Sequence, residues 1–307
     1  MPIAALPPHD APFTPAELAL ARRAYARQML AIAGIENAAI ARGLAAVSRE
    51  AFVGDPPWRV STAFGTDQPL AGTDPVVLYQ DVVVALDAAR GVNNGSPSLH
   101  AKLLDALGPR AGDHVVHIGA GTGYYSAILA ELVGPAGQVT AVEVDPALAR
   151  RATAALSGRT NVRVVCGDGA VWPQTPVDGI YVNFGVIRPA DPWIEHLVPD
   201  GRLVFWLGGP GPERPAMGGR HSDRGAALCV QRQARGRAAR AVSPAYFVCA
   251  EGGLAAHDEA QIAALARAFG GGGLDRVRSL VWKRPIRPDR CWFAGNDWAL
   301  STEVPTP

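Results

Sequence analysis

The feature that most constrains this chain is a glycine-rich turn between a predicted strand and a predicted helix. Residues 114–118 form a short apolar run, and a Gly-x-Gly-x-Gly turn follows at 119–123. Residues 124–132 then show helical periodicity. In open α/β sheets this order of elements presents backbone N–H groups to a nucleotide-like ligand at the start of a helix. Glycine is required there because the turn is tight and a side chain would hold the ligand away from the backbone.

Strands and helices of about ten residues alternate downstream of this turn. Predicted strands at 138–143, 162–166, 179–183 and 202–207 are separated by helices or loops. This alternation predicts an α/β fold with a doubly wound parallel sheet. Two further apolar runs, 226–233 and 237–247, flank an Ala-Arg-Gly turn and predict an antiparallel hairpin at the sheet edge.

From this pattern we expect the chain to divide into three segments. Residues 1–98 form an N-terminal helical and substrate-loop segment, 99–250 the ligand-binding domain, and 251–307 a C-terminal extension packed on the core.

Two ligands compete for the glycine turn, a dinucleotide and S-adenosylmethionine. The dinucleotide fingerprint is G-x-G-x-x-G, and Tyr124 stands where its third glycine would be. A bulky side chain there opposes a pyrophosphate, which S-adenosylmethionine lacks. The later strands end in Glu143, Asp168 and Asn183, which suit ribose hydroxyls, an adenine amine and the neighbourhood of a sulfonium methyl. We therefore predict S-adenosylmethionine as the cofactor. The candidate binding residues are His117, Gly119, Ala120, Gly121, Gly123, Tyr124, Glu143, Asp168, Gly169 and Asn183.

The composition of the chain limits the kinds of binding partner that we expect. The 307 residues carry a formal net charge of +1, which gives no general reason to expect nucleic acid. The four cysteines include no C-x-x-C pair, so we expect reduced thiols and no metal site. The N-terminus has no basic segment followed by an apolar core, and no apolar run approaches the roughly 20 residues that span a bilayer. We expect a cytoplasmic protein without a membrane partner.

Several motifs resemble those of the protein-L-isoaspartate O-methyltransferases over roughly residues 17–250. Residues 47–53 (VSREAFV) are similar to the family's V-P-R-E-x-F-V segment, and Tyr79 and Asp81 match its Y-x-D. The glycine turn, Glu143, the Gly-Asp-Gly at 167–169 and the Pro-Asp-Gly-Arg-Leu-Val at 199–204 also match. The resemblance implies a Rossmann-like class I methyltransferase whose N-terminal segment closes over S-adenosylmethionine.

The match fails at the residues nearest the chemistry. The family's substrate loop reads G-Q-T-I-S-Q-P, and alignment on Pro97 places Asn93 at the Thr position and Gly95 at the Ser position. Ser96 is adjacent, and His117 replaces the acidic residue usual before the first loop glycine. The candidate catalytic residues are Asn93, Asn94, Ser96 and His117. Each has a structural alternative: turn formation for the asparagines, helix capping for the serine, and a bond to a backbone carbonyl for the histidine.

Because of these departures, the resemblance does not identify the methyl acceptor. We predict an S-adenosylmethionine-dependent methyltransferase that O-methylates a carboxylate of a peptide or small molecule, other than the ordinary isoaspartyl repair substrate. A carboxylate is already ionised at pH 7 and needs no base, whereas an alcohol or amide acceptor would use His100 or His117. Two alternatives remain. One is an enzyme that uses the aminobutyryl carbon and releases methylthioadenosine, and the other is a non-catalytic cofactor-binding homologue.

Overall fold

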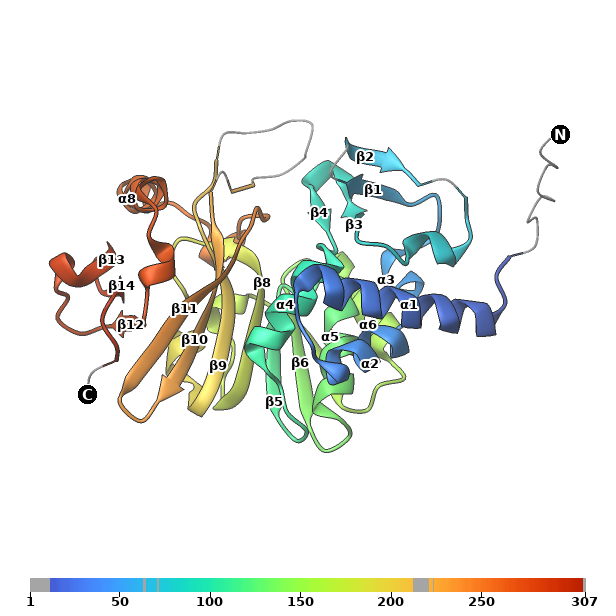
Figure 1. Cartoon of the computed structure of the whole chain (residues 1–307), viewed down its shortest axis with the longest axis horizontal. Helices are drawn as coiled ribbons and strands as arrows, with labels where there is room; N and C mark the ends of the chain where they lie inside the picture. The colour runs from blue at the N-terminus through green and yellow to red at the C-terminus, as the bar shows by residue number, and fades with distance from the viewer. Residues whose placement is uncertain (1–11, 63–64, 71, 212–220, 223, 306–307) are drawn as a thin grey trace.

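The structure, a computed structural model, describes residues 12–62, 65–70, 72–211, 221–222 and 224–305. A ten-stranded sheet runs through the molecule in the order β13-β14-β12-β11-β10-β9-β8-β5-β6-β7 (Figure 1). A separate four-stranded sheet, β2-β1-β3-β4, lies beside the N-terminal helices. No helix in the described ranges is long and apolar enough to cross a membrane.

The parallel half of the large sheet confirms the predicted α/β class. It consists of β5 (His114–Ile118), β6 (Gln138–Glu143), β7 (Val162–Cys166), β8 (Val177–Val186) and β9 (Leu197–Leu207). One face packs against α4 (Pro97–Leu107), α5 (Tyr124–Val133) and α6 (Pro146–Leu156), and α7 (Asp191–Glu195) packs on the other. Because parallel strands point the same way, the turn after β5 and the ends of β6, β7 and β8 meet at one sheet edge.

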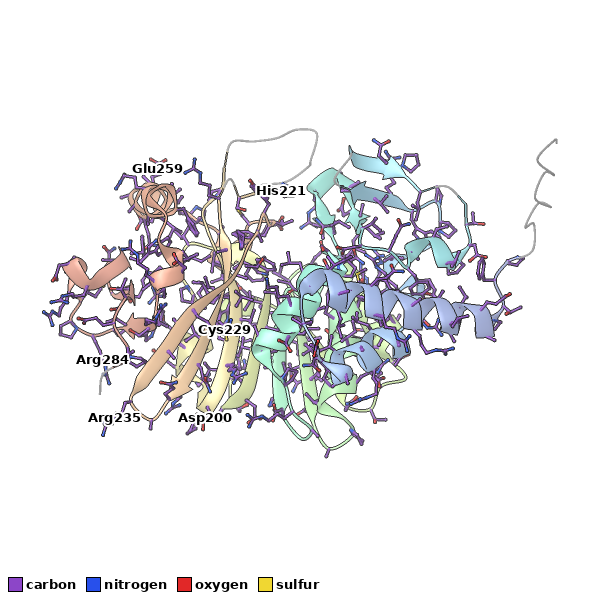
Figure 2. The ribbon with its side chains drawn as sticks, in the orientation of Figure 1. Asp200, His221, Cys229, Arg235, Glu259 and Arg284 are labelled. Atoms are coloured by element: carbon purple, nitrogen blue, oxygen red, sulfur yellow. The ribbon has the colours of Figure 1, made fainter. Side chains whose placement is uncertain are left out.

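The antiparallel half extends further than the sequence indicated. The expected hairpin is present as β10 (Ala226–Gln233) and β11 (Gly236–Pro244), with Arg235 in the turn between them (Figure 2). However, β11 is not the last strand, since β12 (Ser279–Trp282) pairs with it through Ser279 and Ala238. β14 (Trp298–Ser301) and β13 (Cys291–Ala294) continue the sheet, and α8 (Glu259–Gly271) lies against it. Strands of four residues give too short an alternation to be recognised from sequence.

Three helices begin the described chain: α1 (Pro15–Ala33), α2 (Ala38–Ala46) and α3 (Glu50–Val53). α1 begins with a capping box formed by Thr14 and Glu17. Residues 54–77 are rich in Pro, Gly, Asp and Thr, yet they contain β1 (Arg59–Thr62) and β2 (Gly65–Pro69). These pair with β3 (Val83–Asp87), and β3 pairs with β4 (Val92–Asn93). Prolines and glycines between the strands concealed this small sheet from sequence reasoning.

Arg49 ties the N-terminal helices to the small sheet. Its side chain is fully buried and donates hydrogen bonds to the carbonyl oxygens of Leu78 and Val82, at 2.7 and 2.5 Å. It also donates to Oδ1 of Asn94 at 3.2 Å, in the loop that precedes α4. A buried guanidinium needs several acceptors to offset its lost hydration, so this single residue fixes three segments together. The loop at 91–96 is thereby held over the edge of the large sheet.

Candidate functional site

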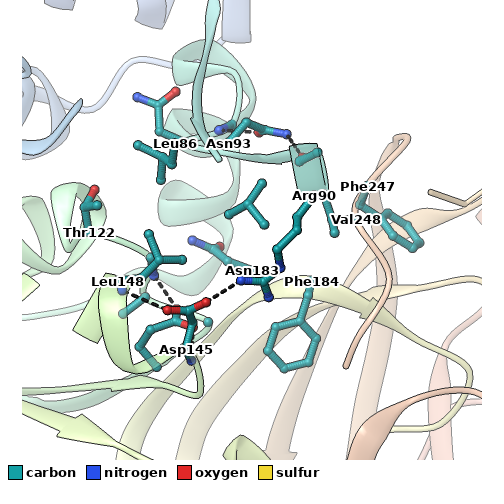
Figure 3. Close-up of a pocket in the computed structure, with 18 of the residues that line it drawn as sticks. Leu86, Arg90, Asn93, Thr122, Asp145, Leu148, Asn183, Phe184, Phe247 and Val248 are labelled. Carbon is teal, nitrogen blue, oxygen red and sulfur yellow. Dashed lines mark hydrogen bonds and ion pairs between the residues drawn. The ribbon is translucent and has the colours of Figure 1, made fainter. Parts of the chain in front are cut away.

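A pocket of about 690 Å³ lies where the parallel strands end. Its floor is the glycine turn and the ends of β6, β7 and β8, and its walls are the loop at 85–96 and the segment at 246–254 (Figure 3). Of the candidate cofactor residues, all but His117 and Gly123 line this pocket. The structure therefore brings together residues that lie as far apart in the chain as Gly119 and Asn183.

The three glycines of the turn are required for different structural reasons. Gly119, Gly121 and Gly123 all adopt positive φ, at +72°, +56° and +94°, which disfavours other residues. A Cβ on Gly119 would lie 2.6 Å from Cδ1 of Phe184 at the pocket floor. A Cβ on Gly123 would instead lie 2.6 Å from Cδ1 of Leu156 on α6. Gly123 therefore allows close helix packing, while Gly119 and Gly121 form the pocket surface.

Glu143 lies at the end of β6 and faces the glycine turn. Its Oε2 accepts a hydrogen bond from the backbone N–H of Gly121 at 2.7 Å, and Oε1 accepts from that of Asp145 at 2.9 Å. Burial raises the pKa of this carboxyl above its ordinary value, while the N–H groups act in the opposite direction. Each oxygen keeps capacity for a further donor. The residue can thus accept two hydroxyl groups from a ligand in the pocket.

Asp168 follows β7 and is already linked to two backbone donors. Oδ1 accepts from the N–H of Ala170 at 2.8 Å, which caps the 3₁₀ turn η3 (Gly169–Val171). Oδ2 accepts from the N–H of Gly253 at 3.3 Å, in the 3₁₀ turn η5 (Gly252–Leu254). Both turns contribute to the pocket wall, through Gly169 and Leu254. A segment beyond residue 250 therefore closes one end of the pocket.

His117 does not lie where a substrate contact requires it. The ring is fully buried, does not line the pocket, and bonds through Nδ1 to Oγ of Ser126 at 2.7 Å. Its Nε2 lies 2.7 Å from Nδ2 of Asn183, so the amide donates and Nε2 accepts. Burial lowers the pKa of this imidazole to about 3. Neither nitrogen is free to act as a base, and its partners are side chains rather than the expected backbone carbonyl.

Asn183 has a side-chain oxygen whose partner is missing. Its Nδ2 is used by His117, while Oδ1 is buried and accepts no hydrogen bond from any described residue. The residue itself lines the pocket, beside Phe184 (Figure 3). Buried polar atoms normally have a partner, so this acceptor indicates a ligand that brings a donor such as an ammonium group.

The three candidate catalytic residues of the substrate loop line the pocket, but most of their polar groups hold the loop itself. Asn93 donates to the carbonyl of Gly91 at 3.1 Å and accepts from the N–H of Gly95 at 2.9 Å. Oδ1 of Asn94 accepts from the N–H of Val84 at 2.9 Å. Ser96 caps α4 and donates to Oδ1 of Asp81 at 2.9 Å. These contacts support the structural alternatives stated for Asn93 and Ser96.

A cluster of charged residues at the pocket rim was missed from sequence. Arg90 forms ion pairs with Asp145 and, at 2.7 Å, with Glu251. Asp145 caps α6 just after Glu143, so one guanidinium connects the 85–91 loop, the end of β6 and the C-terminal segment (Figure 3). No sequence motif predicts this cluster, because Asp145 and Glu251 lie 55 and 161 residues from Arg90 in the chain.

The order of strands, the glycine turn after β5 and the acidic residue ending β6 define the class of fold, that of class I methyltransferases. The chain belongs to the protein-L-isoaspartate(D-aspartate) O-methyltransferase family, whose sequence model matches residues 28–214. Protein-L-isoaspartate O-methyltransferase 2 of Archaeoglobus fulgidus is 39% identical over 122 residues, which are 38% of this chain and 56% of that protein. The alignments with three such relatives span only 50–62% of their length.

Solved structures agree on the fold. One protein-L-isoaspartate O-methyltransferase superposes with a TM-score of 0.60 at 24% identity, covering 86% of this chain and 73% of its own. A putative protein-L-isoaspartate O-methyltransferase from Plasmodium falciparum, in complex with S-adenosyl-L-homocysteine, gives a TM-score of 0.55 at 14% identity. That match covers 75% of this chain and 98% of the Plasmodium protein.

Proposed function

We propose that this protein transfers a methyl group from S-adenosylmethionine to a carboxylate of a peptide, with an isoaspartyl residue as the first acceptor to test. The observation that carries the proposal is that one pocket is lined both by Gly121, Glu143, Asp168 and Asn183 and by residues of the segment at 91–96. Family membership supports the reaction type. The prediction of a small-molecule acceptor, or of a peptide other than the repair substrate, remains an alternative outcome.

The residues present fit this cofactor. Glu143 would accept hydrogen bonds from the ribose hydroxyls, and the Asp168 region with Gly169 would contact the adenine, since all three residues line the pocket. Oδ1 of Asn183 provides an acceptor for the α-ammonium of the methionine part. When bound, S-adenosylmethionine supplies an electrophilic methyl group on a sulfonium, and the electron pair of the broken carbon–sulfur bond stays on sulfur. Gly119 and Gly121 allow close approach of such a ligand to the backbone.

In the proposed methyl transfer, the protein positions the acceptor carboxylate and transfers no proton. A carboxylate is ionised at pH 7, so its oxygen needs only to be held in line with the methyl group. Arg49 and Asp81 make the substrate loop rigid through Asn94 and Ser96, which is what such positioning requires. The segment at 91–96 contains no Lys or Arg, so it adds no positive charge that would pair with the acceptor carboxylate.

The sequence left two alternatives to methyl transfer, an enzyme that uses the aminobutyryl carbon of the cofactor and a non-catalytic homologue. The structure does not support the reason for considering the first. It rested on His117 lying near the methionine part of the cofactor, and His117 is fully buried outside the pocket lining. A non-catalytic homologue remains the contrary outcome to methyl transfer.

The test is incubation with S-[methyl-³H]adenosylmethionine and a matched pair of peptides that differ only in isoaspartyl or aspartyl linkage. We expect base-labile methyl ester on the isoaspartyl peptide alone. Cofactor binding by calorimetry without ester on either peptide would reject the proposed acceptor, and absence of binding would reject the whole proposal.

A further inference from the structure

The imidazole of His100, a residue that lines the pocket, has one nitrogen bonded within the protein and one that has no partner among the described residues. Nδ1 lies 2.6 Å from the hydroxyl of Tyr181, while Nε2 has no hydrogen-bond partner among the residues that the structure describes. His100 lines the pocket beside Gly95, and Nε2 is the ring atom nearest to the side-chain position of Gly95.

The ring is held in one orientation. It stacks on Tyr125 with 3.7 Å between ring centroids and 8° between planes, and the edge of Trp206 packs at 6.4 Å. His100 is only 5% exposed. Burial, with a smaller contribution from His117, lowers its pKa well below 6.5, so the imidazole is neutral.

The hydrogen bond to Tyr181 fixes which nitrogen carries the proton. Tyr181 is fully buried, and burial raises the pKa of its phenol well above 10, so the hydroxyl keeps its hydrogen. His100 is the one partner recorded for that hydroxyl in the described part of the chain. If Nδ1 donated, the phenol hydrogen would be left unpaired in the core, at a cost of about 1–3 kcal/mol. Tyr181 therefore donates to Nδ1, and Nε2 carries the hydrogen.

Asn94 adds a second donor on the same pocket wall. Its Oδ1 accepts from both the N–H of Val84 and the guanidinium of Arg49, which fixes the orientation of the amide. Its Nδ2 is left without an acceptor among the described residues. Gly95 lies between the two donors in the sequence, and all three residues line the pocket.

We propose that the Nε2–H of His100, with the amide of Asn94, holds the acceptor carboxylate, so that His100 is a hydrogen-bond donor and not a base. This inference rests on the proposed function. Two neutral donors orient a carboxylate without pairing its charge, which leaves the nucleophilic oxygen reactive. No proton is transferred, because the carboxylate oxygen that forms the new bond is already ionised. A protic acceptor such as an alcohol would lack a base here.

The tautomer is tested by long-range ¹H–¹⁵N NMR of protein labelled at histidine, with His100→Gln for assignment. We expect the Nε2–H form of His100, and a shift of that proton when the isoaspartyl peptide or acetate is added with S-adenosylhomocysteine. The Nδ1–H form, or no shift with either anion, overturns the inference. A shift with acetate but no methylation of the peptide rejects the proposed acceptor alone.

Kinetics provide the second measurement. His100→Leu is expected to raise the KM for the acceptor at least about tenfold, as loss of a hydrogen bond to a charged group predicts. His100→Gln, which keeps a donor, should recover much of that loss, and Kd for S-adenosylhomocysteine should stay within about twofold in both. Equal effects of Leu and Gln, or a changed kcat pH profile with unchanged KM, would contradict donation by Nε2.

Discussion

A Cβ atom on Gly95 would overlap the imidazole of His100, so the residues at these two positions depend on each other. Gly95 also has a φ of +69°, which disfavours any other residue. The serine that the resemblance places here therefore cannot be restored by a single substitution. His100 occupies the space that its side chain would need.

Gly95→Ser is expected to destabilise the protein by about 1–3 kcal/mol through overpacking, in addition to the backbone cost of the left-handed conformation. Gly112→Ser is the matched control, since Gly112 has a φ of +91° and nothing within 4 Å of its Cβ position. Gly95→Ser should cost less in a His100→Val background than in the wild type, because the ring that its side chain overlaps is gone, and His100→Val alone measures the loss of the Tyr181 hydrogen bond. The measurement is urea unfolding of the five proteins, the wild type included. Equal losses in Gly95→Ser and Gly112→Ser would show that the overlap with His100 has no cost.

Glu143→Gln is expected to weaken binding of S-adenosylhomocysteine at least about tenfold, because the amide offers one acceptor oxygen in place of two. The wild-type carboxylate uses one oxygen for the N–H of Gly121 and the other for that of Asp145. Calorimetry checks this. Glu131→Gln is the control, since Glu131 pairs with Arg159 away from the pocket and should leave Kd unchanged. An unchanged affinity of Glu143→Gln for S-adenosylhomocysteine would show that Glu143 does not bind the cofactor.

Arg90→Met should speed release of S-adenosylhomocysteine several-fold, because it disconnects the C-terminal segment from the pocket rim. The free energy of unfolding should change by no more than about 1 kcal/mol, since Arg90 is 40% exposed and solvent weakens such pairs. Stopped-flow displacement measures the release rate. Arg159→Met removes an ion pair on α5 and should leave that rate unchanged. A large loss of stability with an unchanged rate would make the cluster purely structural.

The two buried histidines predict loss of stability in mild acid. The pKa of His117 is about 3 in the folded protein and about 6.5 when unfolded, so unfolding takes up a proton between these values. The free energy of unfolding therefore falls as the pH drops below 6.5, and His100 acts in the same direction. Between pH 7.5 and 5, His117→Gln should reduce this fall by about 2 kcal/mol. Substitution of the exposed His257 should not change it.

Sequence reasoning reached the large sheet because its signals are local. The apolar run at 114–118, the glycine turn and the periodicity of 124–132 act over a few residues, and the structure has β5 and α5 there. The placement of Glu143, Asp168 and Asn183 at one edge follows from parallel strand order alone. That they bind the cofactor remains a prediction.

The contacts that sequence reasoning missed follow no local sequence pattern. Nothing near Arg90 indicates Glu251, and nothing near Gly95 indicates that His100 would fill its side-chain space. The position of His117 before the glycine turn left a structural role and a ligand contact both open, and in the structure Ser126 and Asn183 use both ring nitrogens. The short strands β12, β13 and β14 are defined by pairing rather than by pattern.

Methyl transfer by this protein is measured most directly by mass spectrometry of one reaction mixture that contains the protein, S-adenosylmethionine and the isoaspartyl peptide. We expect S-adenosylhomocysteine and the peptide methyl ester to form in equal amounts, and Glu143→Gln to lower both together. Methylthioadenosine as the product, or S-adenosylmethionine bound but unchanged, would contradict this expectation.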